Sequence, residues 1–164
     1  MIYAFHVDAT PAVQGNHRIG RNGRIYEASS ARLRDWREAV GWAARTVIRR
    51  GSPFEGPVRL KLAFRLRQAK AGPRTAYPMT RPDLDKLTRA VCDALTGIAY
   101  VDDGQIVELF VTKGWGPPGC GVEVIELVGV TCPVCGQALV DGWDADLFCR
   151  SCGAHVRRPL EVVT

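Results

Sequence analysis

Four aspartates in the second half of the chain have the spacing of a metal site. Asp83 and Asp85 stand where a helix is expected to begin, and Asp102 and Asp103 lie in the turn that follows this helix. One helix start needs one capping carboxylate, and a turn does not require an adjacent acidic pair. If the turn brings the second pair back toward the first, the carboxylates repel one another unless Mg²⁺ or Mn²⁺ lies between them. The alternative is that each aspartate is only a helix cap or a turn residue.

Basic side chains are concentrated in the other half of the chain. Residues 14–81 contain 16 Lys and Arg against 4 Asp and Glu, whereas residues 82–164 contain 6 against 12. Positive potential attracts phosphates and therefore favours a nucleic-acid partner, although a set of solvated arginines is the alternative. An acidic metal site beside a basic surface suits hydrolysis of a phosphodiester, because the surface holds the backbone while the metal polarises the phosphoryl oxygen.

The hydrophobic pattern predicts the elements that must position these groups. Apolar residues recur every three or four positions over residues 30–50 and again from Leu84 to Leu95, which indicates two amphipathic helices. Apolar and basic residues alternate over residues 58–67, which is typical of a strand with one buried face. We therefore predict an α+β domain in which a mixed β-sheet is packed with two main helices. The other expected elements are strands at residues 2–7, 105–113 and 121–127, a long loop from residue 8 to about Tyr26, and an exposed loop at residues 68–80.

A specific motif surrounds the aspartates. It consists of Arg81-Pro82-Asp83-Leu84-Asp85-Lys86-Leu87, then Asp93-Ala94-Leu95-Thr96-Gly97, Tyr100, Asp102-Asp103 and Gln105-Ile106-Val107, with Lys113 later. This motif closely resembles the RusA family of Holliday junction resolvases. The upstream residues also fit the layout of that family, so that the resemblance covers residues 2–127. It implies a RusA-like fold and a homodimeric, Mg²⁺-dependent endonuclease that cuts four-way DNA junctions by paired symmetric nicks.

The resemblance also implies the roles of individual residues. Asp83, Asp85 and Asp103 match the catalytic carboxylates that hold the metal in the family, with Asp102 beside them as a further Mg²⁺ ligand. The family has an important lysine one turn into the helix, and Arg89 occupies that position here. Arginine keeps the charge and binds phosphate in a bidentate manner, but it does not readily act as an acid or a base. A surface ion pair from Arg89 to Asp85 or Asp93 is the alternative.

Basic residues in the loops and on the alternating strand are the candidate contacts to the DNA. The strand supplies Arg59, Lys61, Arg65 and Arg67 on its polar face. The full set of predicted DNA-binding residues is Arg18, Arg21, Arg24, Arg65, Arg67, Lys70, Arg74, Lys86 and Lys113, with Arg59 and Lys61 lying on the same strand face.

Four cysteines near the carboxyl terminus form two C-x-x-C knuckles, Cys132 with Cys135 and Cys149 with Cys152, separated by thirteen residues. This spacing predicts a zinc ribbon in which Zn²⁺ is structural, because four thiolates leave no open coordination position. A redox dithiol is the alternative. The ribbon has three candidate roles: contact with DNA, recruitment of a protein and closure of the fold.

These patterns divide the chain into an endonuclease domain at residues 1–129 and a zinc-ribbon module at residues 130–164. No stretch approaches the roughly 18 apolar residues of a membrane helix, and the amino terminus lacks a secretory signal, so we expect a cytoplasmic protein. Two other functions remain open at this point. One is a nuclease that acts on other branched DNA, and the other is a non-catalytic, DNA-binding zinc-ribbon protein.

Overall fold

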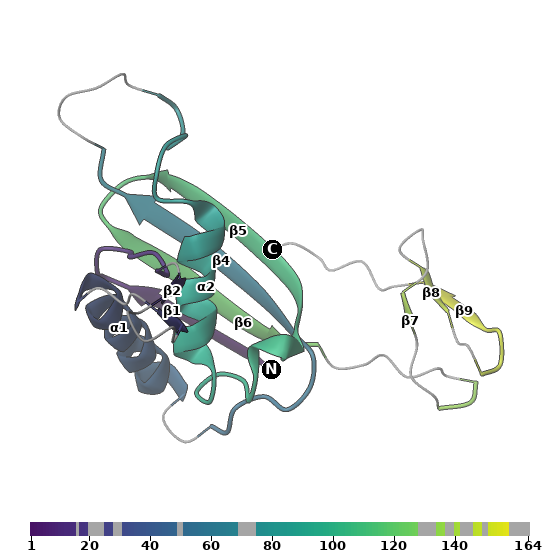
Figure 1. Cartoon of the computed structure of the whole chain (residues 1–164). Helices are drawn as coiled ribbons and strands as arrows, with labels where there is room; N and C mark the ends of the chain where they lie inside the picture. The colour runs from purple at the N-terminus through teal and green to yellow at the C-terminus, as the bar shows by residue number, and fades with distance from the viewer. Residues whose placement is uncertain are drawn as a thin grey trace. The chain divides into compact units, whose positions relative to one another are not determined.

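The structure is a computed structural model that divides into two compact units, Met1–Leu127 and Val128–Thr164 (Figure 1). Among the residues that it describes, no helix is long and apolar enough to cross a membrane. The described residues are 1–15, 17–19, 25–27, 31–48, 51–68, 75–127, 134–136, 140–141, 146–148 and 151–157.

A four-stranded mixed sheet forms the centre of the first unit. Its strands are β1 (Ile2–Val7), β4 (Val58–Leu66), β5 (Ile106–Trp115) and β6 (Gly119–Glu126), in the order β1-β6-β4-β5. Strand β4 pairs parallel with β5 and antiparallel with β6. The apolar residues of β4 at alternate positions, from Val58 to Leu66, are all buried. The predicted mixed sheet and the one-faced burial of this strand are therefore confirmed.

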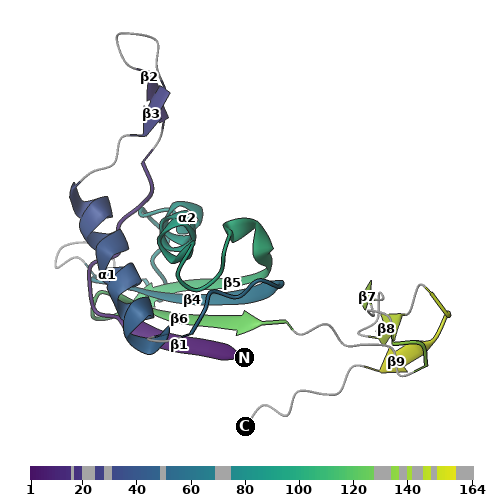
Figure 2. The same cartoon turned by 90° about the horizontal axis from the view of Figure 1, so that it is seen from below.

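Helices α1 (Ala31–Ile48) and α2 (Leu84–Leu95) cover one face of this sheet (Figures 1 and 2). Their apolar stripes meet in one core, in which Trp36 of α1 and Leu87 of α2 are at most 1% exposed. Gly97, with φ of 73°, follows the end of α2 in the left-handed conformation that glycine adopts without strain. The predicted α+β arrangement with two main helices is confirmed.

The connection between the two parallel strands determines where the ends of α2 lie. Because β4 and β5 are parallel, the chain must return between them, and α2 makes this return. The beginning of α2 therefore lies at the carboxyl ends of both strands, and its end lies near the beginning of β5, as Figure 1 shows.

Two segments differ from the prediction. The long loop expected after β1 contains a short hairpin, β2 (His17–Ile19) paired with β3 (Ile25–Glu27). Strand β5 also extends to Trp115 and β6 begins at Gly119, so that much of the expected Gly-rich connection belongs to the sheet. Gly119 is required by a close neighbour, since a Cβ there would lie 2.8 Å from the backbone carbonyl oxygen of Val7.

The described residues of the second unit contain three short strands. They are β7 (Val140–Asp141), β8 (Asp146–Phe148) and β9 (His155–Arg157), and they pair antiparallel in that order. Cys135 and Cys152 each lie in a turn, and each is followed by a glycine, Gly136 or Gly153, with φ of 72° or 75°. Cys135 and Cys152 therefore share a turn that is followed by a glycine at positive φ.

Candidate functional site

Asp83 and Asp85 lie at the beginning of α2. Asp83 occupies the N-cap position with extended backbone, yet its side chain makes no capping hydrogen bond. The amine of Lys86 lies 3.6 Å from its carboxylate. Asp85 follows in the first turn, where the helix dipole favours a negative charge, and both aspartates are exposed. The capping alternative therefore does not describe Asp83, whose carboxylate remains accessible to a ligand.

Asp102 and Asp103 follow α2 and have different environments. They lie at the 3₁₀ helix η1 (Asp103–Gln105), where Asp102 is the N-cap. The Asp102 carboxylate accepts a hydrogen bond from the Gly104 amide at 2.8 Å, and the Gln105 side chain accepts one from the Asp102 amide at 2.8 Å. Gln105 also donates to the carbonyl oxygens of Phe54 and Gly56, which anchors the turn. Asp102 is thus a structural cap, whereas no capping bond to the Asp103 carboxylate is found in the described part of the chain.

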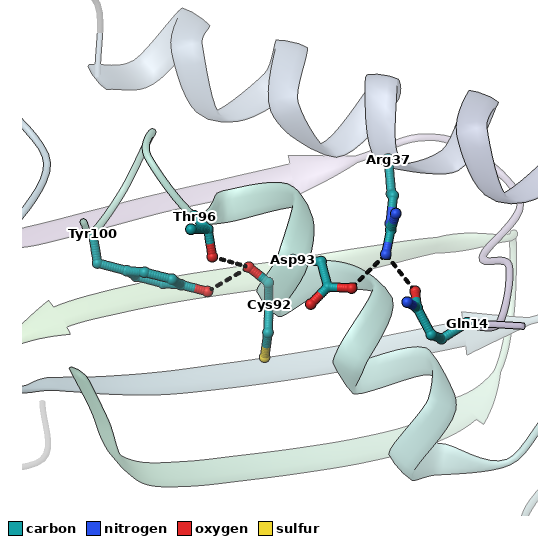
Figure 3. Close-up of polar contacts among 6 residues, drawn as sticks. All are labelled: Gln14, Arg37, Cys92, Asp93, Thr96 and Tyr100. Carbon is teal, nitrogen blue, oxygen red and sulfur yellow. Dashed lines mark hydrogen bonds and ion pairs between the residues drawn. The ribbon is translucent and has the colours of Figure 1, made fainter. Parts of the chain in front are cut away.

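Buried Cys92 and Tyr100 lie near Asp103. The hydroxyl groups of Tyr100 and Thr96 both donate to the carbonyl oxygen of Cys92, at 3.0 and 3.1 Å (Figure 3). Burial, together with the nearby charges of Asp103 and Asp93, raises the pKa of the Cys92 thiol to about 11. The pKa of the Tyr100 hydroxyl is raised as well, mainly by burial. Both groups therefore stay protonated and uncharged at physiological pH.

Asp93 is held by residues that the motif does not include. Arg37 of α1 donates to both the Asp93 carboxylate and the Gln14 side chain, as Figure 3 shows. The backbone N–H of Gln14 in turn donates to the carbonyl oxygen of Lys86 at 3.1 Å. Asp93 therefore joins the two helices and does not contribute to a metal site. Its contact with Arg37 also argues against the predicted alternative for Arg89, which is exposed and has no ion pair within the described ranges.

The two acidic pairs do not meet within one chain. At about 1.5 Å per residue, the 12 residues of α2 separate its ends by about 18 Å. Accordingly, the described residues include no group of three or more His, Cys, Asp or Glu side chains that could hold a metal ion. The expectation that the turn returns Asp102 and Asp103 toward Asp83 is wrong for a single chain, because the crossover through α2 leaves them at the opposite end.

The predicted basic surface is partly neutralised. Arg59 is paired with Glu108, and Lys61 lies 3.4 Å from Glu123. The charges of these two residues of β4 are therefore partly neutralised, which weakens their predicted contact with DNA phosphates. Lys113 is bound to the backbone, where its amine donates to the carbonyl oxygens of Thr80 and Pro82. Arg65 and Arg67 are exposed, and Arg18 lies in β2. The remaining predicted contacts, Arg21, Arg24, Lys70 and Arg74, lie outside the described residues.

The predicted zinc ligands are only partly covered by the structure. Cys135 and Cys152 lie in their exposed turns, whereas Cys132 and Cys149 fall outside the described residues. Cys92 and Cys120 do not belong to the two C-x-x-C knuckles, and both are buried in the first unit.

Comparison with known proteins agrees with the geometry of the first unit. Residues 8–125 match the family described as "Endodeoxyribonuclease RusA". The chain belongs to the RusA family. The match begins just after β1, extends into β6 and includes every aspartate discussed above. The chain is also similar to a Bacillus subtilis (strain 168) protein, "Uncharacterized protein YqaN", with 29% identity over 121 residues that cover 66% of this chain and 84% of the relative.

Membership of the RusA family fixes the general class of the protein. Its members are nucleases that act on branched DNA junctions, so the chain is a hydrolase of the endodeoxyribonuclease type. Nucleases of this kind typically depend on a divalent metal. The exposed carboxylates of Asp83, Asp85 and Asp103 suit such an ion, because Mg²⁺ takes oxygen ligands and accepts only a few carboxylates beside water and phosphate.

Proposed function

We propose that the protein is a Mg²⁺-dependent endodeoxyribonuclease that resolves Holliday junctions by paired symmetric nicks. The observation that carries the proposal is the difference among the aspartates. Asp93 and Asp102 are used by the fold, whereas Asp83, Asp85 and Asp103 keep exposed carboxylates. Within the described residues none of the three makes a capping hydrogen bond, and their one ion pair is the 3.6 Å contact of Asp83 with Lys86. A fold that leaves three carboxylates in this state retains them for a ligand, and a hard divalent cation is the ligand that they suit.

A second copy of the chain supplies the means to bring the three carboxylates together. Strand β5 is an edge of the four-stranded sheet, and three of its apolar side chains are exposed: Val107 by 61%, Leu109 by 49% and Phe110 by 57%. A long apolar edge strand is a template for pairing with another strand. We therefore propose a homodimer in which β5 pairs with β5 of the second copy.

Antiparallel pairing places the two acidic regions in contact. Asp103 precedes the beginning of β5, and Lys113, near the end of β5, contacts the residues that lead to Asp83. In an antiparallel pair the beginning of one strand lies beside the end of the other. Each site then contains Asp83 and Asp85 from one copy and Asp103 from the other, so that the site is complete only in the dimer.

The residues around each site perform the remaining steps. A bound Mg²⁺ would polarise the phosphoryl oxygen and activate the attacking water. Lys86 and Arg89 lie on the same helix as Asp85, and they bind the phosphates of the cleaved strand. Arg89 holds a phosphate through two parallel hydrogen bonds, which orients the strand without requiring proton transfer. A two-fold dimer presents two such sites to the two opposed strands of a four-way junction, which gives paired nicks.

The second unit is proposed to be a structural zinc ribbon. Its four ligands are Cys132, Cys135, Cys149 and Cys152. The support comes from the two described cysteines, which lie in turns of the same conformation, each followed by a glycine at positive φ. Such turns let backbone approach a metal closely, and a unit as small as Val128–Thr164 rarely builds a sufficient core without a metal or a disulfide. Since the substrate is DNA, we place the action of the protein in the cytoplasm.

One cleavage assay tests the proposed function. Labelled four-way junction, flap and linear duplex DNA are incubated with the protein in Mg²⁺ or in EDTA. We expect paired cuts near the junction centre that are absent in EDTA. Cleavage of flaps alone would favour a nuclease for other branched DNA, and binding without cleavage would leave only a DNA-binding role.

Two neighbouring variants sharpen this assay. Asp103→Asn removes the proposed ligand, whereas Asp102→Asn keeps a good cap at the start of η1 because asparagine also caps helices. We expect loss of cleavage only in Asp103→Asn. Equal loss in both variants would contradict the assignment of the two aspartates.

A further inference from the structure

Lys113 connects the end of β5 to the segment that carries Asp83. Its amine donates to the carbonyl oxygen of Thr80 at 3.0 Å and to that of Pro82 at 2.9 Å. Pro82 immediately precedes Asp83, which begins α2. In the sheet, Lys113 is paired with the buried Phe64. Lys113 therefore ties the backbone just before Asp83 to the sheet.

The same strand also holds the other end of this segment. The indole nitrogen of Trp115 donates to the carbonyl oxygen of Thr75 at 2.8 Å. Lys113 and Trp115 are two residues apart and point to the same side of β5. Residues 75–82 contain no helix or strand, so these two side chains, and not a ladder of backbone hydrogen bonds, fix the segment.

Lys113 is poorly placed to act as a mobile phosphate contact. An ammonium group has three donors, and two of them are used by carbonyl oxygens. Moving it to a DNA phosphate would leave the part-buried Pro82 carbonyl without this donor, which is unfavourable. Arg67 and Arg81 are exposed nearby and meet phosphates without such a loss.

The held segment also forms a wall of a groove. A groove of about 490 Å³ is lined by Thr80, Arg81 and Pro82 on one side, with Arg67 and Trp115 among its other residues. Three of the residues that line this groove, Thr80, Arg81 and Pro82, directly precede Asp83 in the chain. Any shift of residues 80–82 therefore displaces the groove and the carboxylate together.

We propose that Lys113 is a positioning residue, which sets the place of Asp83 and of the groove wall by binding the carbonyls of Thr80 and Pro82. The proposal rests on the proposed nuclease function and revises the sequence-based assignment of Lys113 as a DNA contact. Its consequence is that Lys113 acts on the geometry of the site and contributes little to the affinity for DNA.

The test compares Lys113→Met with Arg67→Met, which removes an exposed cation from the same groove. For Lys113→Met we expect amide hydrogen exchange in residues 75–85 to be about 10-fold faster, because the segment loses its anchor. Junction cleavage should fall by up to about 100-fold, as expected for a small displacement of a catalytic group. The dissociation constant for junction DNA, measured in EDTA, should stay within about twofold with an unchanged salt dependence.

Arg67→Met should give the opposite pattern, with weaker DNA binding, a salt slope reduced by about one and normal hydrogen exchange. The proposal is overturned if Lys113→Met reproduces that pattern, or if it leaves both exchange and cleavage unchanged.

If Lys113→Met does not fold, Trp115→Phe removes the bond to Thr75 at the other end of the segment. Faster exchange of residues 75–85 with normal DNA binding then supports the proposal that side chains of β5 hold this segment, and unchanged exchange overturns it. If the wild-type protein cleaves no DNA but Lys113→Met still shows faster exchange, the nuclease function is refuted and the positioning role of Lys113 stands.

Discussion

Asp83 begins helix α2, which is about 18 Å long, whereas Asp103 follows its other end and lies near Cys92 in the last part of the helix. The motif contains both residues, but one chain does not bring them together. The edge strand β5 begins just after Asp103 and ends beside the segment that precedes Asp83. Pairing of two β5 strands therefore explains both the separation of the aspartates and the exposed apolar side chains of this edge.

Disruption of the β5 edge is expected to abolish cleavage by preventing dimer formation. Leu109→Lys places a charge on an edge residue that is 49% exposed in the single chain. Lysine on an edge strand opposes pairing, so we expect the mass in solution to fall from about twice 18.0 kDa to the monomer value. Light scattering after gel filtration measures this change. Val47→Lys, on a similarly exposed apolar residue of α1, is the control and should remain dimeric and active.

Removal of the Asp102 cap is expected to lower stability. Asp102→Ala breaks the capping box of η1 and should reduce the free energy of unfolding by about 1 kcal/mol. Asp103→Ala removes no capping bond, so its unfolding free energy should stay within about 0.5 kcal/mol of the wild type. Urea denaturation in EDTA measures both values. A larger loss of stability in Asp103→Ala than in Asp102→Ala would show that the two roles are assigned in the wrong order.

The buried thiol of Cys92 is expected to make stability fall at high pH. Burial, with Asp103 and Asp93 nearby, raises the pKa of this thiol from 9.0 to about 11. Between these values the unfolded thiol loses its proton while the folded thiol keeps it, so the folded state binds more protons and the free energy of unfolding decreases as pH rises. The contribution is fully present below about pH 9 and is lost progressively above it, by an amount on the order of 2 kcal/mol.

Denaturation of the wild type and Cys92→Ala from pH 8 to 11 measures this effect. Alanine does not titrate, so the free energy of unfolding of the variant should decline less steeply with pH. The cavity left by the smaller side chain lowers stability at every pH and does not change this slope. Parallel curves for the two proteins would contradict the predicted shift of the thiol pKa.

The second unit is expected to contain about one zinc ion per chain. Chelation should release this ion and expose the thiols of the two knuckles to alkylation, because thiolates bound to zinc are protected. Cys92 and Cys120 are buried and should stay unlabelled in the folded protein. Mass spectrometry of the alkylated peptides checks both statements. A metal-free protein with disulfide-linked knuckles would rule out the ribbon.

The fold of the first unit follows from its sequence where the pattern is local. The alternation in β4 and the helical periodicity of α1 and α2 predict their positions to within a few residues, because each pattern reflects burial of one face. The ends of β5 and β6 were missed because glycine and proline usually mark loops. Here Gly114 and Gly119 lie in the sheet, and at Gly119 the carbonyl oxygen of Val7 on the neighbouring part of the chain leaves no space for a Cβ.

The site was harder to predict, since its decisive contacts join residues distant in the chain. Asp83 and Asp85 are recognisable from their motif, and the Asp102 to Gln105 spacing is that of a capping box and distinguishes Asp102 from Asp103. The binding of Lys113 to Thr80 and Pro82 spans more than 30 residues, and no local pattern indicates it. The same holds for Arg37, which approaches Asp93 from another helix.

Subunit complementation tests the shared site most directly. Asp83→Asn and Asp103→Asn are each expected to be inactive alone, since every site in either homodimer lacks one ligand. In a mixed dimer, one site has lost both ligands while the other has both, so an equal mixture should regain about a quarter of the wild-type sites and cut one junction strand per dimer. The account predicts this recovery. A mixture that stays inactive although a tagged subunit shows that exchange has occurred would contradict a site built from two copies.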